Sequence, residues 1–255
     1  MILIPPSEGK APGGTGAPWQ SGVMGVDLDS RREGVLDALV RSTRWRADRR
    51  AKLLGVKGVA LEAATAANAS IRDAPTLPAM ERYTGVLYEA LDVGSLRARD
   101  RARLDRNVLI FSGLWGLVAP TDPIPDYKLK MGATLPGVGR LASFWAGPIS
   151  EHLAAVASTA TVWNLLPNEH DAAWRPPDGV QQFRVKFLNR TNDGSLVAVS
   201  HWNKLLKGAL VRWIVEHPSA VPDDLRDWEH PLGYRLDPAL TDHAPTGTTL
   251  MLVQS

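Results

Sequence analysis

The feature that most limits how this chain can fold is a set of short apolar runs, each ended abruptly by proline or glycine. The first four residues, MILI, run into two prolines, which is typical of a short strand buried on both faces. VLIFSG at 108–113 and VWNLLP at 162–167 have the same character. These runs predict strands of a central sheet, each followed by a loop that carries polar residues.

Two further strands are expected to form a hairpin. Residues 183–189 alternate apolar and polar side chains, and an Asn-Asp-Gly turn separates them from a second strand at 196–201. A last strand is expected at 248–255. Strands mixed with helices, and at least one antiparallel pair, predict an α+β fold with a mixed sheet and surrounding helices, rather than a doubly wound parallel sheet. No linker interrupts the chain, so we expect one domain over residues 1–255.

Helical periodicity marks four segments between these strands. Apolar residues recur on one side and arginine on the other in the first segment, and the third is rich in alanine. The expected helices span residues 29 to about 47, 46–54, 60–72 and 204–217.

The composition excludes several classes of protein. The 255 residues are 44% hydrophobic and 22% charged, as in a globular protein with a sizeable core. The chain has no cysteine, which excludes disulfides, thiolate nucleophiles and cysteine-ligated zinc or iron–sulfur centres. No apolar run approaches the roughly 18 residues of a membrane helix, and the N-terminal run is too short for a signal peptide. We therefore expect a cytoplasmic protein without membrane contact.

Basic residues are clustered although the net charge is only +2. Residues 31–52 contain eight Lys or Arg and three acidic side chains, and residues 97–106 contain five Arg and two Asp. One interpretation is a set of solvated helix faces. The other is a nucleic-acid or phosphate footprint, because such footprints are built from clustered cations rather than from net charge.

The sequence LLGVKGVALEAA at 53–64 has the pattern of a helix-hairpin-helix motif. Its two glycines allow a tight turn whose backbone N–H groups approach a phosphate oxygen, and the next helix adds its N-terminal dipole. Such contacts hold the nucleic-acid backbone without reading bases. The alternative is an ordinary turn between helices with a glycine C-cap. The expected DNA contacts are Arg46, Arg49, Arg50, Gly55, Lys57 and Gly58.

A long loop after the strand at 108–113 carries a second cluster. SGLWGLVAPTDPIPDYKLKMG at 112–132 contains three prolines together with Trp115, Tyr127 and Lys128. Rigid loops that carry an aromatic ring and cations are often binding sites. The alternative is a packed loop in which Trp115 is a buried plug.

Polar residues also follow the strand at 162–167 and precede the helix at 204–217. The run NEHD at 168–171 lacks the ligand spacing of known metal sites, so we expect neither a metal nor a cofactor. Lys204 and Lys207 lie near a helix N-terminus, where the helix dipole favours anions. Cations crowded there indicate a bound anion such as phosphate, and the alternative is a pair of lysines on a solvated face.

Several of these segments, in this order and spacing, resemble the YaaA family of peroxide-stress proteins. They are MILIPPSEGK, RYTG, FSGLWGLVAPTDPIPDYKLKMG, LASFWA, WNLLPNEH and SHWNKLLKG. The resemblance implies one α+β domain with a positively charged groove and a helix-hairpin-helix element. It also implies binding of double- and single-stranded DNA, and a role in limiting oxidative DNA damage by restraining intracellular iron.

This chain departs from the better-known members in two places. Their N-terminal loop reads Ser-Pro-Ala-Lys, so Lys10 matches the family lysine whereas Glu8 is additional. Their last helix carries adjacent lysines, whereas here Lys204 is followed by Leu205 and Lys207 stands where an arginine is usual. These differences alter the charge expected in the groove.

Loops that leave a common sheet edge converge, so the polar residues after the first three strands are expected to share one pocket. Two functions are open: a DNA-binding protein of the peroxide-stress response, or an enzyme acting on a nucleotide, nucleobase or other small phosphate-bearing or anionic substrate. A scaffold without catalysis is a third alternative. The candidate catalytic residues are Lys10, Glu8, Glu169 and Ser112. The candidate ligand-binding residues are Ser7, Trp115, Tyr127, Lys128, Asn164, Lys204 and Lys207.

Overall fold

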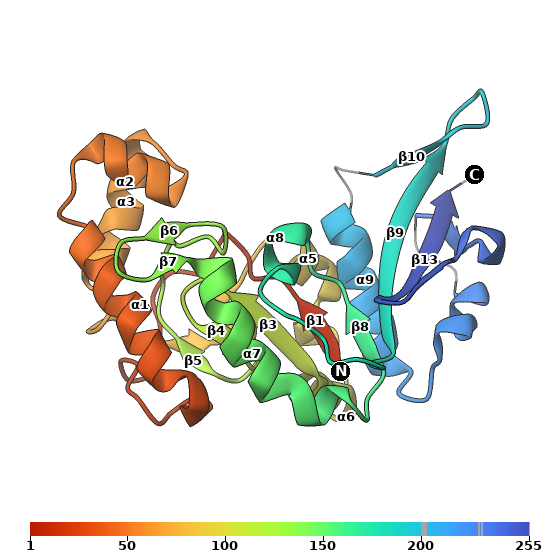
Figure 1. The fold of residues 1–255 in the computed structure, drawn as a ribbon, viewed down its shortest axis with the longest axis horizontal. Helices are drawn as coiled ribbons and strands as arrows, with labels where there is room; N and C mark the ends of the chain where they lie inside the picture. The colour runs from red at the N-terminus through yellow and green to blue at the C-terminus, as the bar shows by residue number, and fades with distance from the viewer. Residues whose placement is uncertain (200–202, 229, 231, 255) are drawn as a thin grey trace.

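The computed structural model describes residues 1–199, 203–228, 230 and 232–254. Within them the main sheet has nine strands in the order β11-β13-β9-β8-β1-β3-β4, with β10 on β9 and β12 on β13 (Figure 1). The strands are β1 (Ile2–Ile4), β3 (Val108–Ser112), β4 (Gly116–Val118), β8 (Val162–Asn164), β9 (Gln182–Arg190), β10 (Leu196–Ala198), β11 (Tyr234–Leu236), β12 (Asp242–Ala244) and β13 (Gly247–Gln254).

Strand β1 lies at the centre of a parallel core. Ile4 pairs with Ile110 of β3 on one side, and Ile2 pairs with Trp163 of β8 on the other, both in parallel register. Strands β9 and β13 continue the parallel arrangement beyond β8. The carboxyl ends of β3, β1 and β8 therefore lie at the same edge of the sheet. From β1 the order of strands runs outward in both directions, to β3 on one side and to β8 on the other. In open α/β sheets this is where ligands bind.

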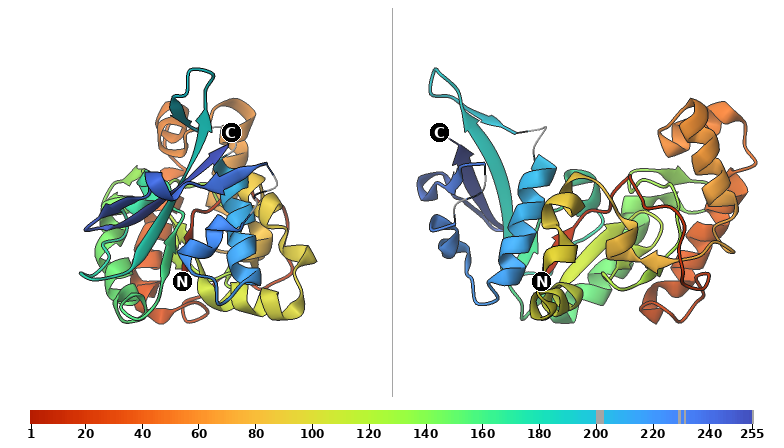
Figure 2. Two further views of the ribbon diagram at one scale, coloured as in Figure 1. Left: turned by 90° about the vertical axis from the view of Figure 1, so that its right-hand side faces the viewer. Right: turned by 180° about the vertical axis from the view of Figure 1, so that it is seen from behind.

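Helices cover both faces of the sheet. Helix α7 lies on one face, and α5, α6 and α9 lie on the other (Figures 1 and 2). The helices are α1 (Asp29–Ser42), α2 (Ala47–Leu54), α3 (Gly58–Ala69), α4 (Ala79–Arg82), α5 (Val86–Leu91), α6 (Ala98–Asn107), α7 (Leu141–Ala157), α8 (Asn168–Asp171) and α9 (Asn203–Glu216). No helix in the described part of the chain has the length and apolar character needed to cross a bilayer.

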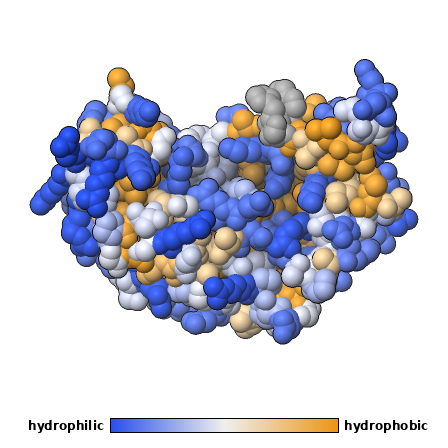
Figure 3. Space-filling model, turned by 45° about the horizontal axis from the view of Figure 1, so that its top comes forward, coloured by the Kyte–Doolittle hydropathy of each residue, from blue (hydrophilic) through white to orange (hydrophobic). Residues whose placement is uncertain are grey.

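The two ends of the molecule rise above the carboxyl edge of the sheet. Helices α2 and α3 form one raised end, and the β9–β10 hairpin forms the other (Figures 1 and 2). Figure 3 shows a hollow between them that is lined largely by hydrophilic residues. This concave edge is the face toward which the loops after β1, β3 and β8 lead.

The predicted mixed sheet with surrounding helices is confirmed, but the class is α/β rather than α+β. The antiparallel pair expected after residue 183 is present as β9 and β10, yet the centre of the sheet is parallel. The strands expected at 1–4, 108–113, 162–167 and 248–255 are present as β1, β3, β8 and β13, although residues 200, 201 and 255 of the expected strands lie outside the described residues.

The first expected helix is shorter than its periodicity indicates. Helix α1 ends at Ser42 because the next three residues form tight turns, in which their N–H groups bond to carbonyls three residues earlier. Helix α2 then begins at Ala47 as expected. Two short antiparallel pairs lie outside the main sheet: β2 (Leu77–Pro78) with β5 (Pro123–Ile124), and β6 (Thr134–Leu135) with β7 (Gly139–Arg140).

A buried arginine fixes the loop that follows β1. The Arg82 side chain is fully buried and donates hydrogen bonds to four backbone carbonyls. Two of them belong to this loop, at Ala11 and at Gly13 (2.7 Å), and the others belong to Pro75 and Ile124. Buried polar groups need such partners, so the arginine and the loop stabilise one another.

Replacing Arg82 with methionine removes these donors and leaves four carbonyls without their partner, of which the one at Ile124 is buried. We expect the free energy of unfolding to fall by about 2–4 kcal/mol in urea denaturation followed by circular dichroism. Arg41→Met is the matched control, because Arg41 lies on the exposed face of α1, and its effect should stay within about 0.5 kcal/mol. Equal losses in the two variants would contradict this role of Arg82.

Candidate functional site

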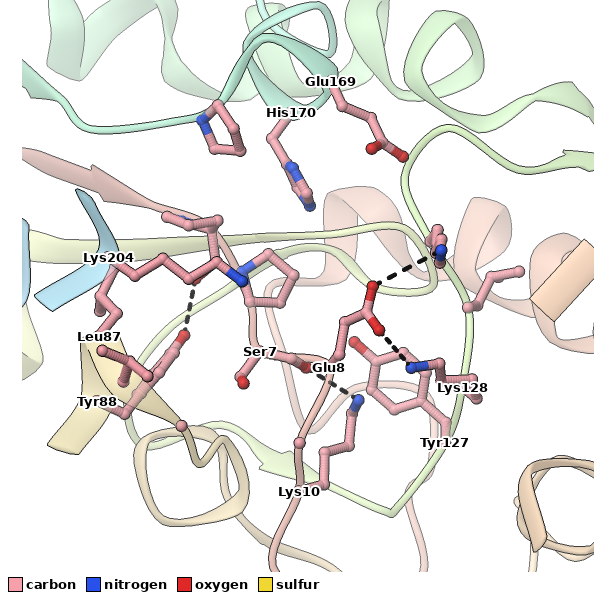
Figure 4. Close-up of a pocket in the computed structure, with 18 residues that line it drawn as sticks. Ser7, Glu8, Lys10, Leu87, Tyr88, Tyr127, Lys128, Glu169, His170 and Lys204 are labelled. Atoms are coloured by element: carbon pink, nitrogen blue, oxygen red, sulfur yellow. Dashed lines mark hydrogen bonds and ion pairs between the residues drawn. The ribbon is translucent and has the colours of Figure 1, made fainter. Parts of the chain in front are cut away.

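A cavity of about 470 Å³ lies at the carboxyl edge of the sheet (Figure 4). Four separate segments meet there: the loop after β1, the start of α5, the extended segment before residue 131, and the loop after β8. Lys204 of α9 completes the lining. The lining residues are 5–10, 85–88 and 127–130, together with Pro167, Glu169, His170 and Lys204. The structure thus brings together Ser7, Glu8, Lys10, Tyr127, Lys128, Glu169 and Lys204 among the residues predicted from the sequence.

The loop after β1 is held in one conformation before any ligand binds. Its carbonyl at Pro5 accepts a hydrogen bond from the Tyr88 hydroxyl at 2.9 Å. Lys10 pairs with Tyr83 in an antiparallel bridge, and the Ala11 N–H donates to the Arg82 carbonyl at 2.8 Å. A loop ordered in this way loses little conformational entropy on binding.

Lys10 is enclosed by aromatic rings and backbone. Its Nζ donates to the Ser7 carbonyl at 3.1 Å and lies 4.3 Å from the centre of the Tyr127 ring and 5.6 Å from that of Tyr83. Figure 4 shows the ammonium between the Ser7 carbonyl and the Tyr127 ring. Burial lowers the pKa of Lys10 to about 8, because the charged form loses hydration.

Glu8 lies within ion-pair distance of two of the lysines around it. Its carboxylate is 2.8 Å from Lys128 Nζ and 3.8 Å from Lys130 Nζ. The hydrogen bond from Lys128 lowers the pKa of Glu8. A carboxylate with a lowered pKa is a weaker base, so this environment suits Glu8 as a charge partner better than as a proton acceptor. The catalytic role of Glu8 stays a prediction.

Lys128 is fixed in turn by helix α3. The buried Asn68 side chain accepts a hydrogen bond from the Lys128 N–H at 2.8 Å and donates to the Lys128 carbonyl at 2.9 Å. This pair of bonds joins α3 to the pocket wall. The position of a pocket cation therefore depends on the helix that follows the predicted DNA-binding turn.

Tyr127 presents its ring to the cavity while its hydroxyl belongs to a buried chain of hydroxyl groups. The Tyr127 hydroxyl lies 2.7 Å from the Tyr83 hydroxyl and 2.7 Å from Ser112 Oγ. Burial raises the pKa of Tyr127 to about 12. Ser112 Oγ also accepts hydrogen bonds from the N–H groups of Leu114 and Trp115. Ser112 is completely buried and does not line the cavity, which corrects its predicted place in the pocket.

Trp115 is also part of the core rather than of the cavity lining. Its side chain is fully buried, and its ring centre lies 5.1 Å from that of Trp19. Its carbonyl accepts a hydrogen bond from the buried Arg32 at 3.0 Å. A ring in this position cannot stack on a ligand in the pocket. The alternative interpretation, in which Trp115 is buried in a packed segment, agrees with this environment.

Two other predicted ligand contacts lie behind the pocket wall. Asn164 is buried and donates to Asp171 at 2.6 Å and to Gln182 at 2.7 Å, which ties β8 to α8 and β9. Lys207 Nζ donates to the Leu165 carbonyl at 2.9 Å, and burial lowers its pKa to about 8. Neither residue lines the cavity, so neither is placed to contact a ligand there.

Helix α8, which follows β8, contributes an anchored carboxylate and a neutral imidazole. Glu169 accepts a hydrogen bond from the Gly132 N–H. Burial lowers the pKa of His170 to about 4, so its ring is neutral near pH 7. Among the described residues its Nδ1 has no hydrogen-bond partner. No group of three or more potential metal ligands occurs within the described residues.

The predicted turn at 53–64 joins two helices. Gly55 ends α2 in the left-handed conformation, with φ +69°, and α3 begins at Gly58. Lys57 and Arg46 are exposed, and the exposed Arg49 lies 3.7 Å from the Trp45 ring centre. Arg50 instead donates to Thr65 at 2.8 Å and to Glu62, both on α3. Arg50 thus connects α2 to α3, and these bonds leave it less available to DNA than the exposed basic residues of the turn. Its DNA contact stays a prediction.

The α2–α3 turn and the pocket adjoin one another through Lys130. A Cβ on Gly55 would lie 2.5 Å from Lys130 Nζ, so the lysine extends directly over the glycine. A second hollow, of about 530 Å³, lies between the turn and the pocket and shares Lys130 and Glu169 with it. Its lining residues are Lys52, Leu53, Gly55, Lys130, Gly132, Ala133, Arg140, Asn168 and Glu169.

Among the lining residues with polar side chains, three were not predicted from the sequence: Tyr88, Lys130 and His170. Lys130 follows Lys128 by two positions, and this spacing in an extended segment could have indicated it. His170 lies in the polar run after β8, whose spacing argues against a metal site and indicates no other role. Tyr88 had no signal in the sequence, because its place depends on the packing of α5 beside β1.

Comparison with known proteins identifies a family and relatives over most of the chain. A family model described as peroxide stress protein YaaA matches residues 1–240. The chain belongs to the YaaA peroxide stress protein family. A UPF0246 protein of Streptomyces coelicolor is 38% identical over 244 residues, covering 93% of this chain and 92% of that protein. A UPF0246 protein of Corynebacterium efficiens is 34% identical over 223 residues and 86% of each chain, and one of Laribacter hongkongensis is 34% identical over 68% of this chain and 67% of its own.

The two hydrogen bonds between the Asn68 side chain and the Lys128 backbone allow a test of how the pocket of this YaaA-family chain is held in place. Asn68→Ala removes both hydrogen bonds to the Lys128 backbone, so we expect a loss of about 2–3 kcal/mol in the free energy of unfolding. Hydrogen exchange at residues 127–130 should accelerate. Asn107→Ala is the control, because Asn107 makes an exposed bond to the Arg103 carbonyl on α6. An unchanged rate of hydrogen exchange at residues 127–130 would show that the Asn68 hydrogen bonds do not hold this segment.

Proposed function

We propose that this YaaA-family protein binds the backbone of DNA through the α2–α3 turn and the hollow beside it. The observation that carries the proposal is the position of Lys130 against Gly55, which joins the turn to the cationic pocket in one surface. Lys52 and Arg140 line the same hollow. Phosphate contacts of this kind hold nucleic acid with little sequence preference.

The local structure of the turn supports backbone contacts. The N-terminus of α3 has no side-chain cap, and its first residues are exposed. Uncapped N–H groups at a helix start favour phosphate oxygens. Arg46, Arg49 and Lys57 add exposed positive charge around this end. The helix-hairpin-helix interpretation accounts for all of these features together.

Binding through phosphates predicts a steep dependence on salt. We expect the affinity for two duplexes of unrelated sequence to fall equally as KCl rises, measured by fluorescence anisotropy. Arg49→Glu combined with Lys57→Glu should weaken both complexes alike and lower the salt slope by about 2.

The control for this experiment is Arg99→Glu combined with Arg106→Glu. Both arginines lie on α6, at the edge of the molecule opposite the α2–α3 turn (Figures 1 and 2). The control makes the same change in net charge, so it should leave the salt slope unchanged. Salt-independent binding, or an equal loss in both double variants, would overturn the proposal.

A second function, binding of a small phosphate-bearing ligand in the pocket, is favoured by the convergence of lysines there. Lys10, Lys128, Lys130 and Lys204 come from three distant parts of the chain and line one cavity. Its volume suits a ligand of nucleotide size. An enzyme acting on a nucleotide or a flipped base would need such a pocket beside a backbone-binding turn, so the two functions are compatible.

The charge balance of the pocket gives a direct test of this second function. Glu8 offsets Lys128 and Lys130, so Glu8→Gln should raise the affinity for pyrophosphate several-fold in isothermal titration calorimetry. Glu151→Gln removes one carboxylate from the exposed side of α7 and should change the affinity little. Pyrophosphate binding that is weakened by Glu8→Gln, or absent from both variants, would contradict an anion site at these lysines.

A further inference from the structure

Lys10 differs from Lys128 and Lys130 of the pocket in its partners. Lys128 and Lys130 lie beside the Glu8 carboxylate. Within the described residues Lys10 forms no ion pair, and its direct contacts are the Ser7 carbonyl and two tyrosine rings. The charged groups that act on it from nearby are Asp126 and Glu8, which raise its pKa, and Lys128 and Arg82, which lower it. Its side chain nevertheless lines the cavity, so a ligand can reach the amine.

This environment favours the reactive form of the amine. With a pKa of about 8, roughly a tenth of Lys10 is uncharged at pH 7, whereas an ordinary lysine is uncharged in about one molecule in three thousand. The uncharged amine is the nucleophile. A lysine that only held phosphate would gain nothing from losing its charge, so the site suits Lys10 for bond formation rather than for ion pairing.

We propose that Lys10 is an amine nucleophile that forms an imine with an aldehyde whose phosphate is held by Lys128, Lys130 and Lys204. The inference rests on the pocket proposed above as a phosphate-ligand site, and it is independent of DNA binding by the α2–α3 turn. The aldehyde could be a small sugar phosphate or the open sugar of an abasic site in DNA, since both combine a carbonyl with a phosphate.

The reaction balances without an oxidant or a cofactor. The Lys10 Nζ lone pair attacks the carbonyl carbon, and the carbonyl π electrons move to oxygen. The oxygen takes two protons, both lost from Nζ, and leaves as water while a second carbon–nitrogen bond forms. One aldehyde and one amine thus give one imine and one water.

Lys207 provides an internal comparison. It is half-buried, as Lys10 is, and its pKa is likewise lowered to about 8. It lies outside the cavity lining, however, and its Nζ is bonded to the Leu165 carbonyl. A reaction that depended only on the lowered pKa would modify both lysines, whereas a reaction in the pocket would modify Lys10 alone.

The experiment incubates the full chain with glyceraldehyde 3-phosphate, or with a duplex oligonucleotide that contains one abasic aldehyde. Sodium borohydride then reduces any imine to a stable amine, and peptide mass spectrometry locates it. We expect modification of Lys10 and not of Lys207 with at least one probe, and the probe that reacts identifies the source of the aldehyde. The initial rate should rise about tenfold from pH 6 to pH 7 and level off above about pH 8.

Two variants of Lys10 distinguish imine formation from binding of the phosphate by positive charge. Lys10→Met should abolish the adduct, and Lys10→Arg should abolish it while retaining pyrophosphate binding. Lys186→Ala, which removes an exposed lysine from β9, should react as the unaltered chain does. Labelling spread evenly over exposed lysines, or unchanged in Lys10→Met, would overturn the inference. Pyrophosphate binding without any Lys10 adduct would overturn the imine alone, whereas loss of pyrophosphate binding would overturn the pocket proposal itself.

Discussion

The position of β1 between β3 and β8 is the constraint on which the rest of the structure depends. All three strands are parallel, so the chain leaves each of them at the same edge of the sheet. The two prolines after β1 then direct Ser7, Glu8 and Lys10 over that edge, while helix α8, which follows β8, brings Glu169 and His170 from the other side. This pairing pattern brings together two pocket segments that are more than 150 residues apart in the sequence.

The second constraint is the connection between the pocket and the helical end of the molecule. Asn68 of α3 holds the Lys128 backbone, and Lys130 extends over Gly55 at the α2–α3 turn. The extended segment that carries both lysines is thereby part of the pocket and of the adjoining hollow. A phosphate bound at the turn and a ligand bound in the pocket would share this segment, which gives the two proposed functions a common structural basis.

The sequence could predict the strand ends and their convergence, but not which side chains face the cavity. Buried runs bounded by proline or glycine are local signals, and so β1, β3 and β8 were predictable. Trp115 and Tyr127 lie in the segment 112–132 that the sequence predicts as one loop, and they look equivalent there. Only the contacts of Trp115 with Trp19 and Arg32, from distant segments, turn its ring into the core. Lys204 and Lys207 differ by less than one helical turn, and the packing of α9 decides which of them reaches the pocket.

A crystal structure of the protein with a short DNA duplex would test the central claim most directly, namely that the carboxyl edge of the sheet and the α2–α3 turn form one phosphate-binding surface. The account predicts that backbone phosphates lie against residues 55–58 and Lys130, and that the strand passes the mouth of the pocket. A duplex bound to the opposite edge, near α6, or to the outer face of α7 would contradict it.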